Sequence, residues 1–138
     1  MSRRSASRRP KNKPARKSRA LRCEPLEQRL ALTVVISEFL AENNSGLQDA
    51  AGHRHDWIEL TNTGGSVEDV SGWYLTDDAL NLTKWQIPAT AATTSLAPGE
   101  SLLVFASGNN GELGAVGDEL HADFQLSQEP GYLGLVGA

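Results

Sequence analysis

The residues that come closest to a chemical site are two histidines and an aspartate. His53, His55 and Asp56 fall within four consecutive positions. A His-x-His pair next to a carboxylate can bind a transition metal, or can supply a general base together with the group that orients it. His121 is the one further histidine able to complete a ligand set, and the single cysteine, Cys23, lies far away in the sequence. We interpret the stretch as a solvated loop before a strand, with a metal site as the alternative.

A second candidate consists of carboxylates. Asp77 and Asp78 precede Asn81 by a few residues, and oxygens of this group could bind a hard cation such as Ca²⁺. Asp56 and Glu59 would lie near them if the strands pair as we expect. The spacing differs from the Asp-x-Asp-x-Asp-Gly calcium loop, and Asp77 can instead cap a turn by accepting hydrogen bonds from backbone N–H groups. We favour the turn, so the sequence predicts no cofactor, with Ca²⁺ as the alternative.

Known catalytic motifs are missing from the sequence. No serine stands in a Gly-x-Ser-x-Gly turn, which would expose a nucleophile. The glycine-rich stretch 108–111 lacks the Lys-Ser/Thr pair of a phosphate-binding loop. We therefore predict that this chain is not itself an enzyme, while a catalytic domain could follow Ala138.

Charge divides the sequence into two parts. Residues 1–32 carry eleven Lys and Arg and two acids, a net charge of +9. Residues 33–138 carry two basic and fifteen acidic side chains, a net charge of −13. Residues 1–20 are too charged and too poor in apolar side chains to bury a core, so we expect a disordered tail. This tail can contact anionic polymers non-specifically, or associate transiently with its own acidic domain.

A short leader or linker is predicted at residues 21–33. Pro25 suits the first position of a helix, and Leu26 and Leu30 would share one face of it. No apolar segment of about 7–15 residues follows the basic start, so we expect no standard signal peptide. No run of about 18 apolar residues predicts a membrane span.

Residues 34–138 have the pattern of an all-β domain, because short apolar runs alternate with Gly, Pro and Asn. A domain of this length buries roughly two-thirds of its unfolded surface and needs neither a disulfide nor a metal to fold. No helical pattern is present in it. The predicted strands cover residues 34–41, 56–62, 72–76, 84–87, 101–106, 124–126 and 131–136.

Three of these strands have distinct patterns. Strand 34–41 is almost continuously apolar, and we expect it to be covered on both faces. In strand 56–62, Ile58 and Leu60 fall on one face, opposite the odd-numbered residues. The apolar run in strand 101–106 is typical of a central strand.

Two Pro-Gly pairs mark turns. Pro98-Gly99 and Pro130-Gly131 each follow or precede a predicted strand. Proline fixes φ at the second position of a type II turn, and glycine accepts the positive φ of the third. We therefore expect a type II turn at each pair.

The three tryptophans fall in one stretch at intervals that resemble those of a known family. The matching residues are Trp57 and Glu59, then Gly72 and Trp73, and then Trp85. They resemble the lamin tail domain, which implies an immunoglobulin-like β-sandwich. In that fold we expect the tryptophans to pack in the core and at corners rather than to form stacking platforms. The matched segments are Asp56-Trp57-Ile58-Glu59-Leu60-Thr61-Asn62, Ser71-Gly72-Trp73-Tyr74-Leu75-Thr76-Asp77-Asp78 and Thr83-Lys84-Trp85-Gln86-Ile87-Pro88.

The resemblance also implies a role. Bacterial lamin tail domains commonly stand beside other domains, so we expect a non-catalytic interaction or scaffold module whose protein partner or neighbouring domain is unknown. Residues 24–32 resemble the Leu-Glu-Pro-Leu-Glu-Asp-Arg-Leu-Leu-Leu-type leader of large planctomycete proteins thought to be exported. This implies the N-terminus of a larger bacterial protein, placed outside the cell or at its surface. Members of the family usually continue past the segment matching 132–136, so we expect the C-terminal strands to be missing here.

Two other roles remain open. The first is an accessory domain of an enzyme, of the spore-coat-kinase-like, nuclease or phosphatase type, whose catalytic part lies beyond Ala138. The second is a nuclear lamin-like structural protein, the animal setting of the fold. That role requires a coiled-coil rod, and residues 1–33 contain no sustained heptads.

Overall fold

A computed structural model of the chain describes residues 32–89, 94–108, 119–129 and 131–138. All regular secondary structure in these residues is β, as the sequence predicts, and none of it is helical. The predictions for the tail, residues 1–20, and for most of the leader, residues 21–33, lie outside the described residues. The strands are β1 (Val34–Leu40), β2 (Asp56–Asn62), β3 (Glu68–Asp69), β4 (Tyr74–Thr76), β5 (Trp85–Gln86), β6 (Ser95–Leu96), β7 (Ser101–Ala106), β8 (Leu120–Ala122) and β9 (Gly134–Val136).

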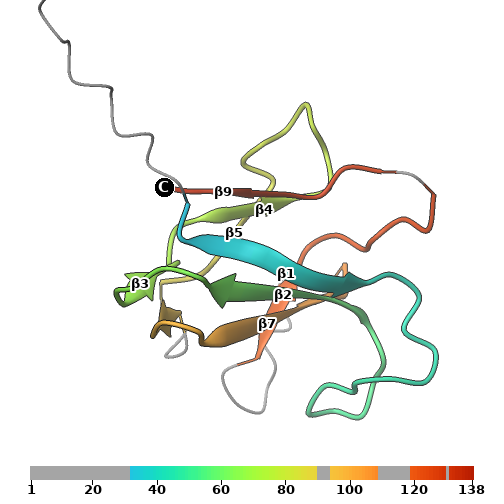
Figure 1. The fold of residues 1–138 in the computed structure, drawn as a ribbon. Coiled ribbons are helices and arrows are strands. Elements are labelled where there is room, and N and C mark those ends of the chain that lie inside the picture. Colours follow the sequence, from blue (N-terminus) through green and yellow to red (C-terminus); the bar gives the residue numbers. More distant parts are fainter. Residues whose placement is uncertain (1–31, 90–93, 109–118, 130) are drawn as a thin grey trace, which may run out of the picture.

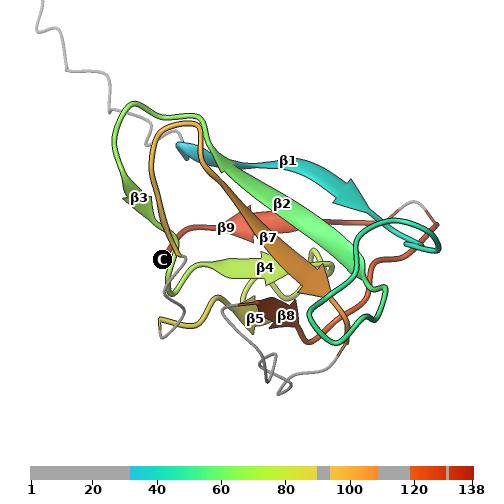
Figure 2. The same ribbon diagram turned by 90° about the horizontal axis from the view of Figure 1, so that it is seen from below.

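The strands form two layers. One layer is a four-stranded sheet in the order β1-β2-β7-β8, antiparallel except for the parallel pair β7 and β8. The other is a three-stranded antiparallel sheet in the order β5-β4-β9. Figure 1 shows the two layers, with β1 running close to β9, and Figure 2 shows them from below. The short pair β3 and β6 forms a third, two-stranded sheet.

The core lies between the two layers, and alternation along the strands builds it. Ile58 and Leu60 are completely buried, while the odd-numbered residues of β2 lie on the outer face of the sheet and are partly exposed. Strand β7 is interior to its sheet, as predicted, and both β2 and β7 have the predicted bounds. The core residues are Val34, Ile58, Leu60, Val70, Leu75, Trp85, Ile87, Leu96, Leu102, Val104, Ala106, Leu120, Ala122 and Phe124. This arrangement confirms the predicted β-sandwich.

The tryptophans differ in depth. Trp85 belongs to the core, and Trp73 is half-buried and packs against it. Trp57 lies on the outer face of β2, half-buried, and its indole N–H has no acceptor among the described residues. Packing is therefore confirmed as the role of Trp85 and Trp73.

The expectation that strand 34–41 is covered on both faces is wrong. Most side chains of β1 are exposed and only Val34 is fully buried, so the strand is not covered on both faces. Among the described residues, β1 is the edge strand of its sheet, next to β2. Its pairing with β2 also shifts register between Ile36 and Glu38. Such a bulge, together with a charged residue, is a common way to protect an edge strand from pairing with another chain.

The predicted strand 124–126 is also wrong. No strand forms there, and the neighbouring strand is β8, which pairs in parallel with β7. Phe124 is nevertheless buried in the core, so its apolar side chain is packed by a loop rather than by a strand. The apolar character of Phe124 therefore predicted its burial correctly, but it did not show whether the backbone of this segment pairs as a strand.

One of the predicted turns is confirmed. Gly99 has a φ of 80°, and the N–H of Glu100 donates to the carbonyl of Ala97 at 2.9 Å. This is the geometry expected for Pro98-Gly99 at the centre of a type II turn. The second pair includes Pro130, which lies outside the described residues. Within the described part of the chain, no helix is long and apolar enough to cross a membrane.

Candidate functional site

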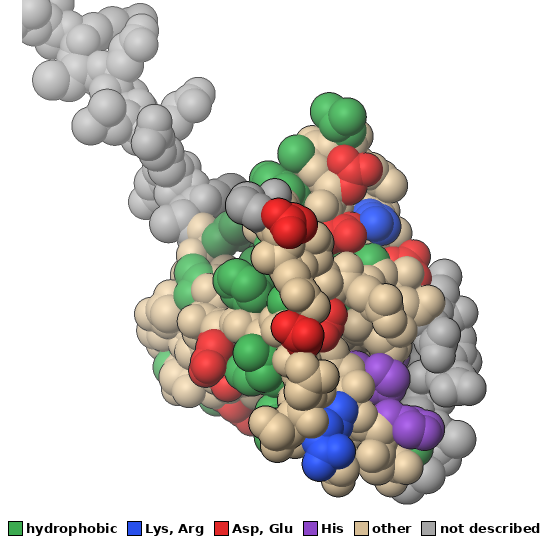
Figure 3. All heavy atoms as spheres, turned by 90° about the vertical axis from the view of Figure 1, so that its right-hand side faces the viewer, with side chains coloured by type: hydrophobic (Ala, Val, Ile, Leu, Met, Phe, Trp, Pro, Cys, Tyr) green, Lys and Arg blue, Asp and Glu red, His purple; other side chains and the backbone are tan. Residues whose placement is uncertain are grey.

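Three side chains of metal-binding type meet at one end of the four-stranded sheet. They are Asp49, His55 and His121, and one ligand atom from each lies within 4.8 Å of the other two. His55 Nε2 is 3.2 Å from Asp49 Oδ2. Histidine side chains gather in one place on the face of the molecule drawn in Figure 3. In the described residues, no other group of three His, Cys, Asp or Glu side chains comes this close together.

The pleat of the sheet places the two histidines on the same face. His55 precedes β2 by one residue, and its side chain follows the odd-numbered, outer face of that strand. His121 pairs with Phe105, which in turn pairs with Trp57, so a row of side chains crosses three strands on this face. The rings of Phe105 and His121 stack with centroids 5.3 Å apart, and His55 meets Phe105 edge-on.

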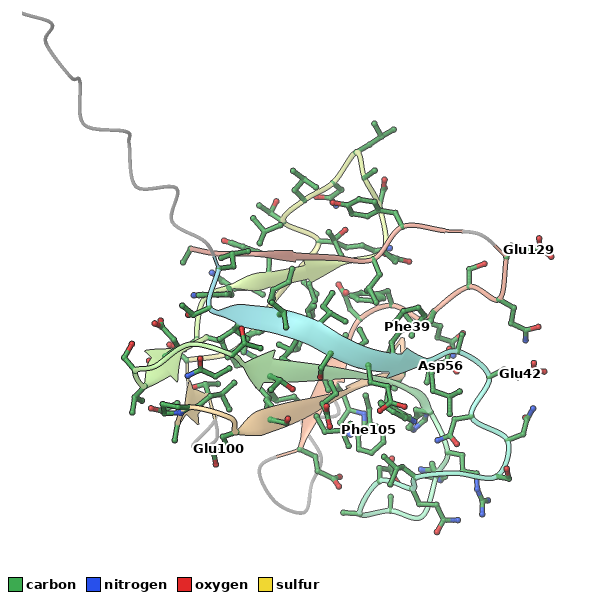
Figure 4. All side chains as sticks on the ribbon, viewed as in Figure 1. Phe39, Glu42, Asp56, Glu100, Phe105 and Glu129 are labelled. Carbon is green, nitrogen blue, oxygen red and sulfur yellow. The ribbon has the colours of Figure 1, made fainter. Side chains whose placement is uncertain are left out.

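Phe105 shows how closely this face is covered. It is only 3% exposed, although it lies outside the core between the two layers (Figure 4). The imidazoles of His55 and His121 lie 5.7 Å apart, centroid to centroid, next to its ring. These contacts fix the imidazoles in place, because each ring packs against a buried aromatic surface.

Asp49 comes from the loop between β1 and β2. Its backbone N–H donates to His53 O and its carbonyl accepts from Gly52 N–H, both at 2.9 Å, and Gly52 takes a φ of 84°. The N–H of His53 donates to Asp49 Oδ1 at 2.8 Å, so Oδ2 is the oxygen directed at His55.

The pKa of Asp49 lies below its usual value. Burial of the carboxyl works in the opposite direction, since it disfavours the charged form. The backbone N–H of His53, the charges of His53 and His55 and the backbone N–H of Ala51 together outweigh it. Asp49 is therefore a carboxylate at neutral pH, ready to accept a proton donor or a cation.

Of the two candidate histidines, only His55 lies in this cluster. His55 belongs to the site, whereas the His53 side chain is 67% exposed and its Nδ1 is 3.7 Å from Asp49 Oδ2. Asp56 points elsewhere: its carboxylate accepts from the backbone N–H groups of Glu42 at 2.8 Å and Leu126 at 3.1 Å. The carboxylate of the site is thus Asp49, which the sequence analysis missed because it stands six residues before His55 in an irregular loop.

The acidic group around Asp77 does not assemble as predicted. Asp77 forms an ion pair with Lys84. Glu59 lies on the outer face of the other sheet, where the Ser37 hydroxyl donates to its carboxylate at 2.6 Å. Capping of the turn is the right role for this pair, but Asp78 performs it by accepting from Leu80 N–H at 2.8 Å.

The hydroxyl of Thr76 stabilises the same turn from the side of the core. Its hydroxyl lies 3.0 Å from the carbonyl of Asp78 and 2.7 Å from the carbonyl of Asn81. The N–H of Asp78 donates to the hydroxyl at 3.0 Å. Because Thr76 is fully buried, the turn is anchored in the core.

A separate pocket of about 550 Å³ opens between the end of β1 and the loop before β9. Phe39, Glu42 and Glu129 lie on this side of the molecule, together with Asp56 (Figure 4). Asp56 holds two of the walls together, since it accepts one hydrogen bond from each. The lining residues are Phe39, Ala41, Glu42, Asp77, Leu126, Ser127, Gln128, Glu129, Gly131, Tyr132 and Leu133.

The fold and these two features define an immunoglobulin-like β-sandwich with a lateral pocket and a small His/Asp cluster. Residues 28–133 match the model of the family described as Lamin Tail Domain. The chain belongs to the lamin tail domain family, as the spacing of its tryptophans suggests. Comparison with curated proteins and with solved structures gives no match.

Proposed function

We propose that this chain is a non-catalytic interaction module that binds an extended segment of a protein partner in the pocket beside β1. The observation that carries the proposal is the exposure of large side chains around it. Phe39 is 56% exposed and Tyr132 is 43% exposed, and both line the pocket. Exposed aromatic side chains around a concave surface are typical of protein-binding sites.

The charge of the pocket lining indicates the chemistry of the partner. Three acids line the pocket, Glu42, Asp77 and Glu129, and Lys84 pairs with Asp77 alone. Acidic and apolar side chains are interspersed on this face (Figure 3). The complementary ligand is a peptide with one aliphatic or aromatic anchor flanked by Lys or Arg, because such a peptide satisfies both the apolar and the acidic lining.

The strained backbone of Glu42 supports a binding role for the edge of the pocket that it lines. Glu42 has a φ of 65°, the left-handed region that side-chain-bearing residues rarely adopt. The hydrogen bond from its N–H to Asp56 holds it there. Strain of this kind costs about 1–3 kcal/mol and is concentrated at functional sites.

The His/Asp cluster does not form a serine-nucleophile site. Ser107 is the hydroxyl nearest to it, with Oγ 3.1 Å from His121 Nδ1. Ser107 is buried, so a substrate cannot reach the hydroxyl as a nucleophile would require. We therefore propose a chain without enzymatic activity, while an accessory role beside a kinase-like, nuclease or phosphatase domain remains the second candidate.

The host of the module is proposed from resemblance. Residues 24–32 resemble the leader of large exported planctomycete proteins, so we place the module in a larger bacterial protein at the cell surface or outside the cell. An acidic, disulfide-free sandwich is compatible with that setting, because it needs no redox partner to fold.

The test is selection of a random-peptide library on the full chain. Enriched peptides should share one apolar anchor with at least one flanking Lys or Arg, and their affinity should fall with added salt. Phe39→Ser should weaken binding by about tenfold or more, since it removes the more exposed of the two aromatic side chains that line the pocket. Glu42→Gln and Glu129→Gln should each reduce the preference for basic peptides.

A matched control uses another exposed apolar side chain. Val67 is 62% exposed and does not line the pocket, so Val67→Ser should leave peptide binding unchanged. Peptides without a common pattern, or binding that is equally sensitive to Phe39→Ser and Val67→Ser, would contradict the proposed pocket.

A further inference from the structure

We propose that Asp49, His55 and His121 form a binding site for a divalent transition-metal ion of the Zn²⁺ type. The donor set is two imidazole nitrogens and one carboxylate oxygen. Imidazole favours Zn²⁺ and its neighbours in the transition series, whereas Ca²⁺ and Mg²⁺ require oxygen ligands. The donor set therefore selects against the hard cation that the sequence suggested for the acidic turn.

Distances in the cluster fit one small ion. Zinc bonds to histidine nitrogen at about 2.0–2.1 Å and to carboxylate oxygen at about 2.0–2.2 Å, so tetrahedral ligand atoms stand roughly 3.3–3.5 Å apart. The separation of 3.2 Å between His55 Nε2 and Asp49 Oδ2 is already close to this. The third ligand atom lies within 4.8 Å of both, so a shift of at most about 1.5 Å brings His121 into coordination.

Two of the ligands have partners that orient them. Asp49 is fixed through Oδ1 by the backbone N–H of His53, which leaves Oδ2 directed at His55. The Ser107 hydroxyl lies 3.1 Å from His121 Nδ1 and helps to fix the orientation of that ring. Hydrogen bonds of this kind to the second nitrogen or oxygen of a ligand are usual around protein-bound metals.

The loop that carries Asp49 is already tied to the strand that carries His121. The backbone N–H of Ala50 donates to Glu119 Oε2 at 2.9 Å, across a sequence separation of 69 residues. Glu119 directly precedes β8, and His121 is the central residue of that strand. The ligands are thus brought together before any ion binds, which reduces the ordering cost of binding.

Bound metal would join the β1–β2 loop to the parallel edge strand β8. Three protein ligands leave a fourth position for water. Since the ion would bind the folded chain and not the unfolded one, it would act as a cross-link between residues far apart in the sequence. This role is independent of the peptide pocket, whose lining contains none of the three ligands.

The test is calorimetric titration of the full chain with ZnCl₂ at neutral pH, with Cys23→Ser in place and without any histidine tag. Binding of one Zn²⁺ per chain is expected, with no response to CaCl₂ or MgCl₂. His55→Ala and His121→Gln should each weaken Zn²⁺ binding by about a hundredfold or more, and Asp49→Asn by about tenfold or more. Co²⁺ should give the visible absorption of a tetrahedral site, and this absorption should disappear in His121→Gln.

The control separates the proposed site from a simple His-x-His chelate. His53→Ala should leave Zn²⁺ affinity within about threefold, because His53 is outside the ligand set. If His53→Ala abolishes binding while His121→Gln does not, the loop pair is the site and the proposal is wrong. Absence of stoichiometric Zn²⁺ binding by the folded chain would overturn it as well, and would leave the 3.2 Å approach of His55 Nε2 to Asp49 Oδ2 as a contact within the fold only. Circular dichroism of each variant establishes that it is folded.

Discussion

Asn62 ends β2 with a polar side chain that is completely buried. Its Nδ2 donates to the carbonyls of Ser66 at 2.7 Å and Leu96 at 2.9 Å. Its Oδ1 accepts from the N–H of Gly64 at 2.9 Å. One amide therefore organises the turn after β2 and attaches it to β6, in the lamin tail segment where the sequence showed only the end of a strand.

Replacing Asn62 with alanine should lower the free energy of unfolding by about 2–4 kcal/mol. The substitution leaves one buried carbonyl, one part-buried carbonyl and one part-buried N–H without their partner, and unsatisfied buried groups cost about 1–3 kcal/mol each before relaxation. Urea denaturation of the two proteins measures the difference. Ser66→Ala, at an exposed position in the same turn, should change stability by no more than about 0.5 kcal/mol. An Asn62→Ala protein within 1 kcal/mol of the parent, about the value of one hydrogen bond, would contradict this role.

Asp69 makes stability depend on acid pH. The backbone N–H of Ser71 lowers the pKa of this carboxyl below its usual 3.8, helped by the hydroxyls of Ser71 and Thr94 and opposed by burial. A folded-state pKa below the unfolded value adds stability above pH 3.8, and this contribution is lost as the pH falls through the folded pKa. Asp69→Asn should therefore flatten the loss of stability below pH 4, measured as melting temperature against pH. If the melting temperature of Asp69→Asn falls below pH 4 as steeply as that of the parent, other carboxylates control the loss of stability in acid.

The candidate site shows what sequence could and could not predict at the level of residues. His55 was recognisable because the His-x-His spacing is local. Asp49 was not, because its place beside His55 depends on a turn closed by Gly52 and on a hydrogen bond from Ala50 to Glu119. His121 was recognised only as a remaining histidine, since its position follows from the parallel pairing of β8 with β7.

Among the elements, the bounds were predicted best for two of the longest strands, and two of the shortest were not predicted. β2 and β7 have seven and six residues, and their alternation fixed both bounds and buried faces. β3 and β6 have two residues each, too few to show a period of two. β8 was missed for a similar reason, because a three-residue strand with a central histidine has no apolar run.

Strand β1 was recognised but its surroundings were not. An apolar run predicts a strand without saying whether a second neighbour covers it. Here no second layer covers the outer face of β1: Val34 is fully buried, while Val35, Phe39 and Leu40 are exposed. The adjacent residues Val34 and Val35 therefore allow a direct test of which face of the strand is buried.

Val34→Ala should cost about 1.5–3 kcal/mol, the value of burying a valine side chain, whereas Val35→Ala should cost no more than about 0.5 kcal/mol. The two substitutions remove the same atoms from neighbouring positions, so the difference reports only the face of the strand. Guanidinium denaturation of both variants measures it. Equal losses would mean that β1 is covered on both sides, as the sequence first suggested.

On the scale of the whole molecule, charge is the property that the fold does not explain. Residues 33–138, which contain most of the lamin tail match, carry a net charge of −13, and residues 1–32 carry +9. Electrostatic attraction at low salt can bring the basic residues to the acidic domain or to an external polyanion. The two outcomes differ in how the full chain interacts with DNA, which is used here as a generic polyanion.

The full chain should bind a short DNA duplex of any sequence, and the fragment 32–138 should not. Residues 1–32 contain no aromatic side chain for stacking on bases, so the contact is to phosphates only and carries no sequence preference. The logarithm of the binding constant should fall linearly with the logarithm of salt concentration, with a slope of about −0.9 for each phosphate neutralised. Changing Arg3, Arg4, Arg8 and Arg9 to Gln should make that slope shallower, as fluorescence anisotropy at several salt concentrations would show.

Because the acidic domain repels DNA, binding by 32–138, or a preference among duplex sequences, would refute an electrostatic contact through the basic residues. Failure of the full chain to bind even at low salt would show that the acidic domain itself occupies them.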